Sequence, residues 1–225
     1  MARLKRLAEP TEIDRMKDER SFSPKTVSKY LYDLLRSLRL NFDAINYELS
    51  LETYEDLRFP ATSVNPPGSV SDPDWDMTNG GWLFNAASTE VVYIIAQLPH
   101  SWAEGTEIEP HVHWQKTTSA SGDVLWRFEY KWAPTNDVMD TSFTTLNVSS
   151  TVDGTPDTGT ADKHLVSSLG WIDSSNKQIS DMLIMKLSRV GGDALDTYGD
   201  DARLLEFDIH YKVNSRGSLF PYVKD

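Results

Sequence analysis

The sequence predicts a mainly β protein: an antiparallel, jelly-roll-like β-sandwich preceded by an N-terminal arm and one amphipathic helix. Three patterns indicate this fold. Apolar and polar residues alternate through residues 124–132 and again through residues 205–213, as they do in half-buried strands. Nearer the N-terminus, apolar residues recur at spacings of four and three between Leu31 and Leu49, the period of a helix that buries one face.

The composition is that of one substantial folded domain with an added arm. The chain has 225 residues, of which 39% are hydrophobic and 11% aromatic, enough to build a core. It has no cysteine, which excludes disulfides, thiolate metal sites and a cysteine nucleophile. The longest apolar run, Val91 to Ile95, is too short to span a bilayer, and the basic N-terminus lacks the apolar segment of a secretory signal. We therefore expect a soluble protein made in a cytoplasm.

Charge divides the chain into two parts of opposite sign. Residues 1–40 contain ten Lys/Arg and six Asp/Glu, a balance of +4, whereas residues 41–225 contain twelve and twenty-eight, a balance of −16, which together give the net −12. An acidic larger part argues against a dedicated nucleic-acid surface, because phosphate binding needs clustered basic residues. We expect the basic arm to anchor the chain to an acidic partner. The anchoring residues would be Arg3, Lys5, Arg6, Arg15 and Lys17.

Residues 1–53 are predicted to form this anchoring arm and an oligomerisation helix. Ser23 and Pro24 mark the helix start, since serine caps a helix and proline is tolerated in its first turn. The helix should end near Leu49. Its apolar seam follows spacings of 4, 3, 4, 3 and 4, which favours association with other copies, a trimer being preferred; packing on its own domain is the alternative. The seam consists of Leu31, Leu35, Leu38, Phe42, Ile45 and Leu49.

Residues 54–81 are predicted to be a connector, and residues 82–225 the β-sandwich. Proline and glycine are dense in the first range, which disfavours helices and interior strands. Within the second range, the β-branched run Val91–Ala96 is predicted as a strand buried on both faces, and residues 183–188 as an alternating strand. Residues 140–163 should hold one weak strand between loops.

A His-x-His motif is the sharpest candidate for chemistry. Period two places Glu109, His111 and His113 on one face of a predicted strand. Together with His210 on a second strand, these histidines would supply three imidazoles, as in a cupin-like metalloprotein. Cupins, however, have a glutamate a few residues beyond this motif, and residues 114–118 contain none. The preferred interpretation is therefore a polar layer or interface, with no metal or cofactor assigned.

Seven tryptophans offer a second kind of binding surface. Trp126 and Trp132 lie on an alternating strand and should pack in the core. Trp75, Trp82 and Trp102 lie in loop-like surroundings, so they are candidates for a subunit interface or for stacking on sugar rings. A carbohydrate-binding β-sandwich is therefore retained as an alternative.

Motifs of common enzyme classes are absent from the sequence. There is no Gly-x-Ser-x-Gly nucleophile elbow, no phosphate-binding glycine loop before a helix and no dinucleotide fingerprint. No pair of carboxylates is singled out by spacing as an acid and a base. We therefore expect no enzymatic activity and assign no catalytic residues.

Several short stretches in combination resemble a poorly characterised family of tailed-bacteriophage virion proteins. The stretches are Leu98-Pro99-His100-Ser101-Trp102, Pro110-His111-Val112-His113-Trp114, Ala161-Asp162-Lys163-His164, Leu205–Tyr211 and Ser215-Arg216-Gly217-Ser218. The resemblance covers residues 54–218 and leaves the helix outside.

This resemblance implies a non-enzymatic structural component of a virion: a tail fibre or its adaptor, or a capsid decoration or head-fibre protein. Its partners would be copies of itself, larger capsid, portal or tail proteins, and a host-surface glycan, without membrane insertion. We expect the N-terminus to anchor the protein while the β-sandwich faces outward.

Overall fold

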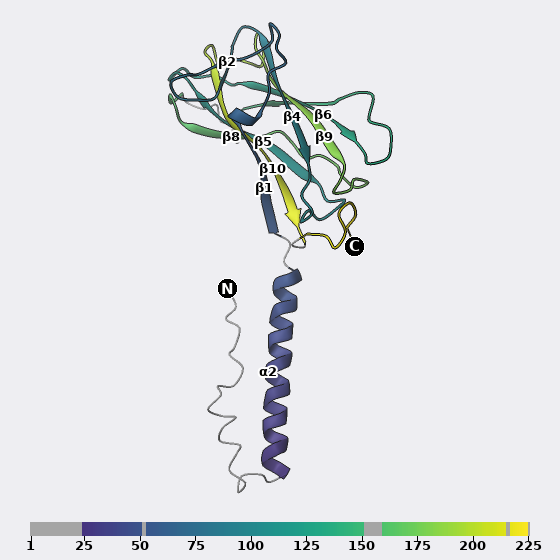
Figure 1. Ribbon diagram of the computed structural model, residues 1–225. Helices are drawn as coiled ribbons and strands as arrows, with labels where there is room; N and C mark the ends of the chain where they lie inside the picture. The colour runs from purple at the N-terminus through teal and green to yellow at the C-terminus, as the bar shows by residue number, and fades with distance from the viewer. Residues whose placement is uncertain (1–23, 51–52, 151–158, 215–216, 225) are drawn as a thin grey trace. The chain divides into compact units, whose positions relative to one another are not determined.

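The computed structural model describes residues 24–50, 53–150, 159–214 and 217–224 (Figure 1). Within the helix, side chains are described for residues 28–45. The chain divides into two compact units, Met1–Glu52 and Thr53–Asp225, and each is described by itself. In the described ranges, no helix has the length and hydrophobicity needed to span a bilayer.

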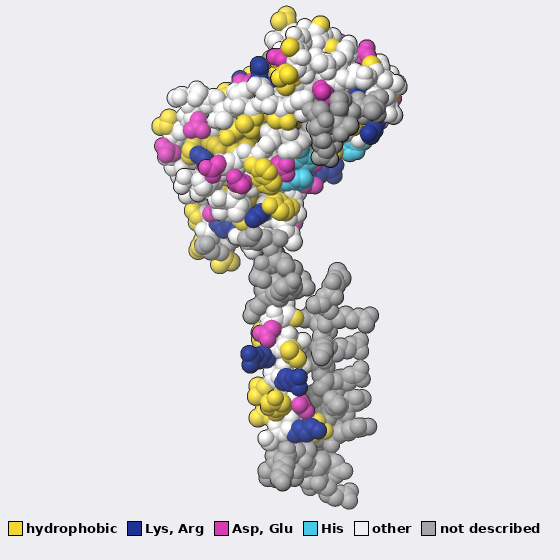
Figure 2. Space-filling view, turned by 180° about the vertical axis from the view of Figure 1, so that it is seen from behind, with side chains coloured by type: hydrophobic (Ala, Val, Ile, Leu, Met, Phe, Trp, Pro, Cys, Tyr) yellow, Lys and Arg dark blue, Asp and Glu magenta, His cyan; other side chains and the backbone are white. Residues whose placement is uncertain are grey.

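The first unit contains a single described helix, α2, which spans Pro24–Ser50. Its bounds agree with the predicted start at Pro24 and end near Leu49. Between residues 28 and 45, an apolar stripe runs along the helix among charged side chains (Figure 2). Leu49 and the predicted anchoring residues of the arm fall outside the residues whose side chains are described.

The second unit is a sandwich of two antiparallel sheets, as predicted. The larger sheet, sheet A, has the order β2-β3-β10-β5-β8, with β1 also pairing with β10; sheet B has the order β4-β9-β6-β7. The strands of sheet A are β1 (Thr53–Pro60), β2 (Asp74–Trp75), β3 (Trp82–Phe84), β5 (Ile108–Lys116), β8 (His164–Ser168) and β10 (Ala202–Val213). The strands of sheet B are β4 (Thr89–Gln97), β6 (Leu125–Ala133), β7 (Thr144–Ser149) and β9 (Met182–Val190).

The chain crosses repeatedly between the two sheets, which gives the jelly-roll connectivity. Taking β3 to β10 in chain order, the four strands β3, β5, β8 and β10 build one sheet while β4, β6, β7 and β9 build the other. Apart from the consecutive pairs β2–β3 and β6–β7, neighbours within each sheet are distant in sequence, as in two interlocked Greek keys. Strands β1 and β2 extend sheet A beyond this eight-stranded frame, and η2 (Ala61–Ser63) follows β1.

The core lies between the two sheets and is rich in aromatic side chains. Trp114 of sheet A meets Trp126 of sheet B at a ring distance of 5.9 Å, and Phe207 stacks on Phe128 at 5.8 Å. All four are almost fully buried. The alternation predicted for residues 124–132 is confirmed, because Trp126, Phe128 and Trp132 point inward.

Two predictions about individual segments need correction. Residues 54–81 are not only a connector, because β2 and all of β1 except Thr53 lie in this range and belong to sheet A. The boundary between units, at Glu52 and Thr53, lies within one residue of the predicted end of the N-terminal part. The run Val91–Ala96 is not buried on both faces, since β4 is an edge strand of sheet B. Ile95 on its outer face is 60% exposed, whereas Val92 and Ile94 on its inner face are buried.

Candidate functional site

Four neighbouring strands of sheet A present polar side chains on the face that points away from the core. In the register of β1, β10 and β5, His210 lies opposite both Asp56 and Glu109. Two residues earlier on β10, Asp208 lies opposite Arg58 on β1 and His111 on β5. The next pair across β10 and β5 is Glu206 and His113. Strand β8 pairs with the other edge of β5. It carries Val166, which lies opposite His113, and His164.

A β-bulge on β10 decides which side chains join this face. The pairing between β10 and β5 shifts between Leu204 and Glu206, so that Leu205 is the extra residue. A bulge of one residue reverses the inward and outward alternation that follows it. Leu204 and Phe207 are consequently both buried in the core, while Glu206 and Asp208 point to the outer face.

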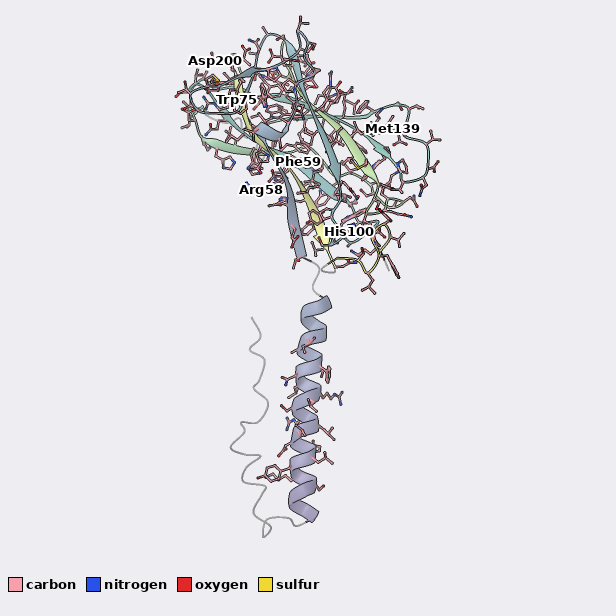
Figure 3. All side chains as sticks on the ribbon, viewed as in Figure 1. Arg58, Phe59, Trp75, His100, Met139 and Asp200 are labelled. Atoms are coloured by element: carbon pink, nitrogen blue, oxygen red, sulfur yellow. The ribbon has the colours of Figure 1, made fainter. Side chains whose placement is uncertain are left out.

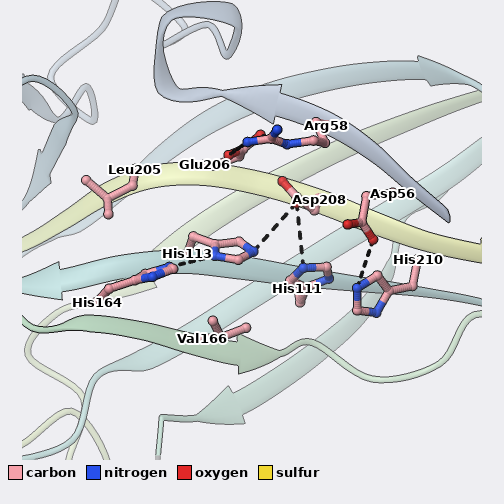
Figure 4. Close-up of a pocket in the computed structure, with 10 residues that line it drawn as sticks. All are labelled: Asp56, Arg58, His111, His113, His164, Val166, Leu205, Glu206, Asp208 and His210. Carbon is pink, nitrogen blue, oxygen red and sulfur yellow. Dashed lines mark hydrogen bonds and ion pairs between the residues drawn. The ribbon is translucent and has the colours of Figure 1, made fainter. Parts of the chain in front are cut away.

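The outer face is hollowed into a pocket of about 590 Å³. Figure 4 shows how its side chains converge from β1, β5, β8 and β10. On the surface of the β unit, histidines lie beside acidic and basic side chains (Figure 2). The pocket is lined by Asp56, Arg58, His111, His113, His164, Val166, Leu205, Glu206, Asp208 and His210.

The centre of the pocket contains two histidines and one carboxylate that face each other. Nε2 of His111 lies 3.8 Å from Oδ2 of Asp208, and Nε2 of His113 lies 3.6 Å from the same oxygen (Figure 4). One potential ligand atom from each of the three residues lies within 4.8 Å of the other two. His111 and Asp208 are almost completely buried, and His113 is partly buried.

Burial sets the charge state of this group. Desolvation, reinforced by the neighbouring His210 and His113, lowers the pKa of His111 to about 4. Desolvation also lowers the pKa of His113, with His164 adding to the effect. The pKa of Asp208 is raised to about 7 by burial and then by the nearby Glu206 and Asp56 carboxylates. At neutral pH the imidazoles are therefore uncharged, and their approach to Asp208 is not an ion pair.

The other charged side chains of the pocket are largely paired with one another. Arg58 donates two hydrogen bonds to Glu206, at 2.7 Å from Nε and 2.6 Å from a terminal nitrogen. This bidentate contact lowers the pKa of Glu206. Nε2 of His210 lies 2.9 Å from Oδ1 of Asp56, and Nδ1 of His210 lies 3.5 Å from Oε2 of Glu109. Both nitrogens of His210 thus face carboxylates.

A fourth histidine supports the central group from β8. Nδ1 of His113 lies 2.7 Å from Nε2 of His164, one nitrogen donating a hydrogen bond and the other accepting it. The two rings stack at a centroid distance of 4.9 Å. This contact fixes the orientation of His113, so that its Nε2 points toward Asp208.

The structure brings together residues that the sequence placed on separate strands. Glu109, His111 and His113 share one face of β5, as their spacing predicts, and the rings of His111 and His210 lie 4.1 Å apart. Sequence reasoning missed Asp208 and His164 as members of the same group. The alternation of residues 205–213 did place Asp208 and His210 on one face, but nothing local pairs that face with His111.

The seam of α2 is exposed where its side chains are described. Leu31, Leu35 and Phe42 are 54%, 56% and 62% exposed, and Ile45 is also exposed, whereas Leu38 is half-buried. An apolar stripe of this kind stabilises a helix only when another surface covers it.

The tryptophans singled out as loop residues are mostly covered. Trp102 is buried, and Trp75, labelled in Figure 3, packs edge-on against Trp82 at 4.9 Å. All seven tryptophans lie in the described ranges, and Trp171 is the exposed one among them. Its ring meets the exposed Tyr54 edge-on at 6.5 Å.

The sequence matches no protein-family model and no curated protein sequence. Among solved structures, the chain is similar to the CBM36-1 domain of a multidomain xylanase from the hindgut metagenome of Trinervitermes trinervoides, with 13% identity, a TM-score of 0.36, and coverage of 69% of this chain and 96% of that domain. It is also similar to a family 35 carbohydrate-binding module from Clostridium thermocellum, with 13% identity, a TM-score of 0.30, and coverage of 68% and 97%.

A chain of the infectious bursal disease virus Gx strain structure is similar at 11% identity and a TM-score of 0.34, and the match covers 75% of this chain but 33% of the viral chain. All three TM-scores are low. The β-sandwich assignment therefore rests on the two sheets of the chain itself, and the residues of the site must carry any functional conclusion.

Proposed function

We propose that this protein is a non-enzymatic, self-associating structural component of a tailed-phage virion. In this proposal α2 joins copies of the chain, with a trimer as the preferred assembly, and the β-sandwich is displayed outward as part of a tail fibre, an adaptor, or a capsid decoration or head fibre. The observation that carries self-association is the exposed seam of α2. The virion assignment is supported by the resemblance of residues 54–218 to phage structural proteins.

A second copy of the same helix is the partner that this seam fits best. Its described residues keep spacings of 4, 3, 4 and 3 from Leu31 to Ile45, the repeat that keeps one stripe facing a parallel partner. Charged side chains flank the stripe, as shown by Arg39 and Asp43, whose side chains are 85% and 65% exposed. A helix of 27 residues is long enough for several such layers.

Mutation of the seam tests self-association, with a matched control on the same helix. Leu35→Gln combined with Phe42→Gln should shift the mass in solution toward the 25.5 kDa of the monomer. Leu40→Gln combined with Tyr32→Gln removes exposed apolar side chains of similar size outside the seam, Leu40 being about 180° from its centre, and should leave the mass unchanged. Light scattering measures both. A monomeric wild type, or equal dissociation of both variants, would contradict the proposal.

Attachment to the particle is assigned to the basic arm. Basic residues of the arm, among them Arg3, Lys5, Arg6, Arg15 and Lys17, would pair with acidic surfaces of a larger virion protein, since exposed charges steer and hold such contacts. Ion pairs of this kind weaken as salt screens them. Sedimentation of particles at increasing salt should release the protein before its oligomer dissociates, and attachment that is insensitive to salt would argue against this role.

Carbohydrate binding is a second candidate, favoured by the exposed pair Trp171 and Tyr54. Aromatic faces at a surface stack on sugar rings. A glycan array with the full chain tests this candidate. Binding that Trp171→Ala abolishes and Tyr222→Ala, at another exposed aromatic residue, preserves would support it; binding unaffected by Trp171→Ala would not.

A further inference from the structure

We propose that His111, His113 and Asp208 bind a divalent transition-metal ion on the outer face of sheet A. This site goes beyond the structural role proposed above, and it uses none of the residues of the helix seam. It rests on three observations: the spacing of the three side chains, the lack of other partners for their buried atoms, and the excess of carboxylates around them.

The spacing of the ligand atoms is close to that of a bound ion. Zinc lies about 2.0–2.2 Å from nitrogen and carboxylate ligands, so that two ligands of a tetrahedral site are about 3.4 Å apart. The two distances from Oδ2 of Asp208 to the imidazole nitrogens are 3.6 and 3.8 Å. Small side-chain rotations would therefore complete the geometry. The register of β5 and β10 holds the side chains in place, because His111 and Asp208 are direct cross-strand partners.

Atoms of all three residues are buried without a hydrogen-bond partner. They are Nδ1 of His111, Nε2 of His113 and Oδ1 of Asp208. Asp208 is 3% exposed and His111 is 4% exposed, so water does not freely solvate them. Leaving such atoms unpaired costs free energy, and each case in a folded protein calls for an explanation. A cation between the three side chains would give Nε2 of His113 the partner that it lacks and would bind the carboxyl group of Asp208.

The surrounding charges favour a cation over a purely polar cluster. Glu206 and Asp56 line the same pocket as Asp208, so that three carboxyl groups share it. Arg58 is close too, but its guanidinium is committed to Glu206 through two short hydrogen bonds. A divalent ion at Asp208 would offset this crowding of carboxylates, because a bound cation is the largest local charge in such a site.

The donor set selects the class of metal. Two imidazole nitrogens and one carboxylate oxygen suit zinc and other first-row transition ions, whereas calcium and magnesium prefer sites made of oxygen alone. The remaining coordination positions would open toward the pocket in Figure 4.

His210 is not assigned as a ligand, although its ring lies beside that of His111. Its two nitrogens face Asp56 and Glu109, which hold the ring away from a metal-binding orientation. The geometry therefore points to two histidines and a carboxylate as ligands. This set differs from the three imidazoles, those of His111, His113 and His210, that the sequence pattern indicates.

Calorimetric titration of the full-length, chelator-treated protein with Zn²⁺ tests the site. We expect one Zn²⁺ per chain, and we expect His113→Ala and Asp208→Asn each to weaken binding more than about 100-fold, beyond the loss typical of residues that only support ligands. His100→Ala is the matched control, because His100 is hydrogen-bonded to Ser218 and does not line the pocket. His210→Ala should also leave the affinity within a fewfold of wild type.

The proposal would be overturned by no binding in wild type, by binding that survives both His113→Ala and Asp208→Asn, or by an equal loss in His100→Ala. Without binding in wild type, His111, His113 and Asp208 would be a polar cluster only. Binding that survives both substitutions would place the ion on surface carboxylates instead. A loss in His210→Ala as large as in His113→Ala would replace the proposed donor set. Circular dichroism establishes that each variant is folded, and the visible spectrum of bound Co²⁺ reports the ligands independently.

Discussion

Asp208 and Asp76 show how position in this fold decides the behaviour of a carboxyl group. Asp208 is buried among other carboxylates and two imidazoles, and its pKa is raised to about 7. Asp76 accepts hydrogen bonds from the backbone N–H groups of Asn79 and Thr78 and from Arg203, and its pKa is lowered to about 2. The first carboxyl is available to an added cation, whereas the second is already engaged in holding a turn.

His164 should act as a positioning residue for the metal site. We predict that His164→Ala weakens Zn²⁺ binding by about 10- to 100-fold, the effect typical of a residue that orients a ligand, because Nδ1 of His113 loses its partner. His164→Gln should recover much of the affinity, since the glutamine amide oxygen can accept a hydrogen bond from Nδ1 of His113. Calorimetry measures both variants. Equal weakening by alanine and glutamine would show that the hydrogen bond is not what positions His113.

Asp76 predicts a pH dependence of stability. Its folded-state pKa of about 2 lies below the ordinary value of 3.8, so its stabilising contribution is present above pH 3.8 and is lost as the pH falls toward 2. We expect Asp76→Asn to lower the melting temperature at pH 7, where Arg203 loses an ion pair at 2.9 Å. The difference from wild type should persist down to about pH 4 and shrink below it. A difference that stays constant to pH 2 would contradict this assignment.

At the scale of elements, the bulge on β10 connects the core with the pocket. The pairing of β5 with β10 places His111 opposite Asp208 only because Leu205 is accommodated as an extra residue. The same device lets Leu204 and Phe207 both face the core. On β1, the neighbours Arg58 and Phe59 repeat the division: Arg58 pairs with Glu206 outside, and Phe59 packs on Phe207 at 6.0 Å (Figure 3).

Removing the bulge should be far more damaging than shortening its side chain. Deletion of Leu205 would reverse the faces of the following residues, bringing Glu206 and Asp208 toward the core. Turning these carboxyl groups into the apolar core, and Phe207 out of it, should cost more than the roughly 5–15 kcal/mol that stabilises a typical domain, so we expect no cooperatively folded protein. Leu205→Ala keeps the register and should cost about 1 kcal/mol. Urea unfolding followed by circular dichroism compares them, and a deletion variant with wild-type stability would refute this role of the bulge.

Elements with strong local periodicity could be predicted from the sequence. Helix α2 and the inward faces of β6 and β9 follow directly from spacing, as Met185 and Leu187 illustrate. Strand β1 was missed because it is charged, with Leu57 and Phe59 as its inward apolar residues, and because it adjoins a proline-rich stretch. The pocket could not be predicted in full, since its geometry depends on the bulge and on pairing between strands about 100 residues apart.

At the scale of the whole molecule, the two proposals belong to different units. The seam lies in Met1–Glu52, whereas every residue of the metal site lies in Thr53–Asp225. A jelly roll occurs in viral structural proteins and in sugar-binding domains alike, so the fold by itself does not choose between the candidate functions. The two properties should therefore separate when the chain is divided at the boundary between units.

A chain consisting of residues 53–225 provides this separation. Its two sheets and their shared core are complete without the helix, so we expect it to fold, with circular dichroism showing the strand content of the full chain. Light scattering should report a monomer, because the seam is absent, while calorimetry should still detect one Zn²⁺ with the affinity of the full-length protein. An oligomeric fragment would place self-association on the sandwich instead of α2. A folded monomer without zinc binding would leave self-association standing and contradict the metal site alone, because all three of its proposed ligands are present in the fragment.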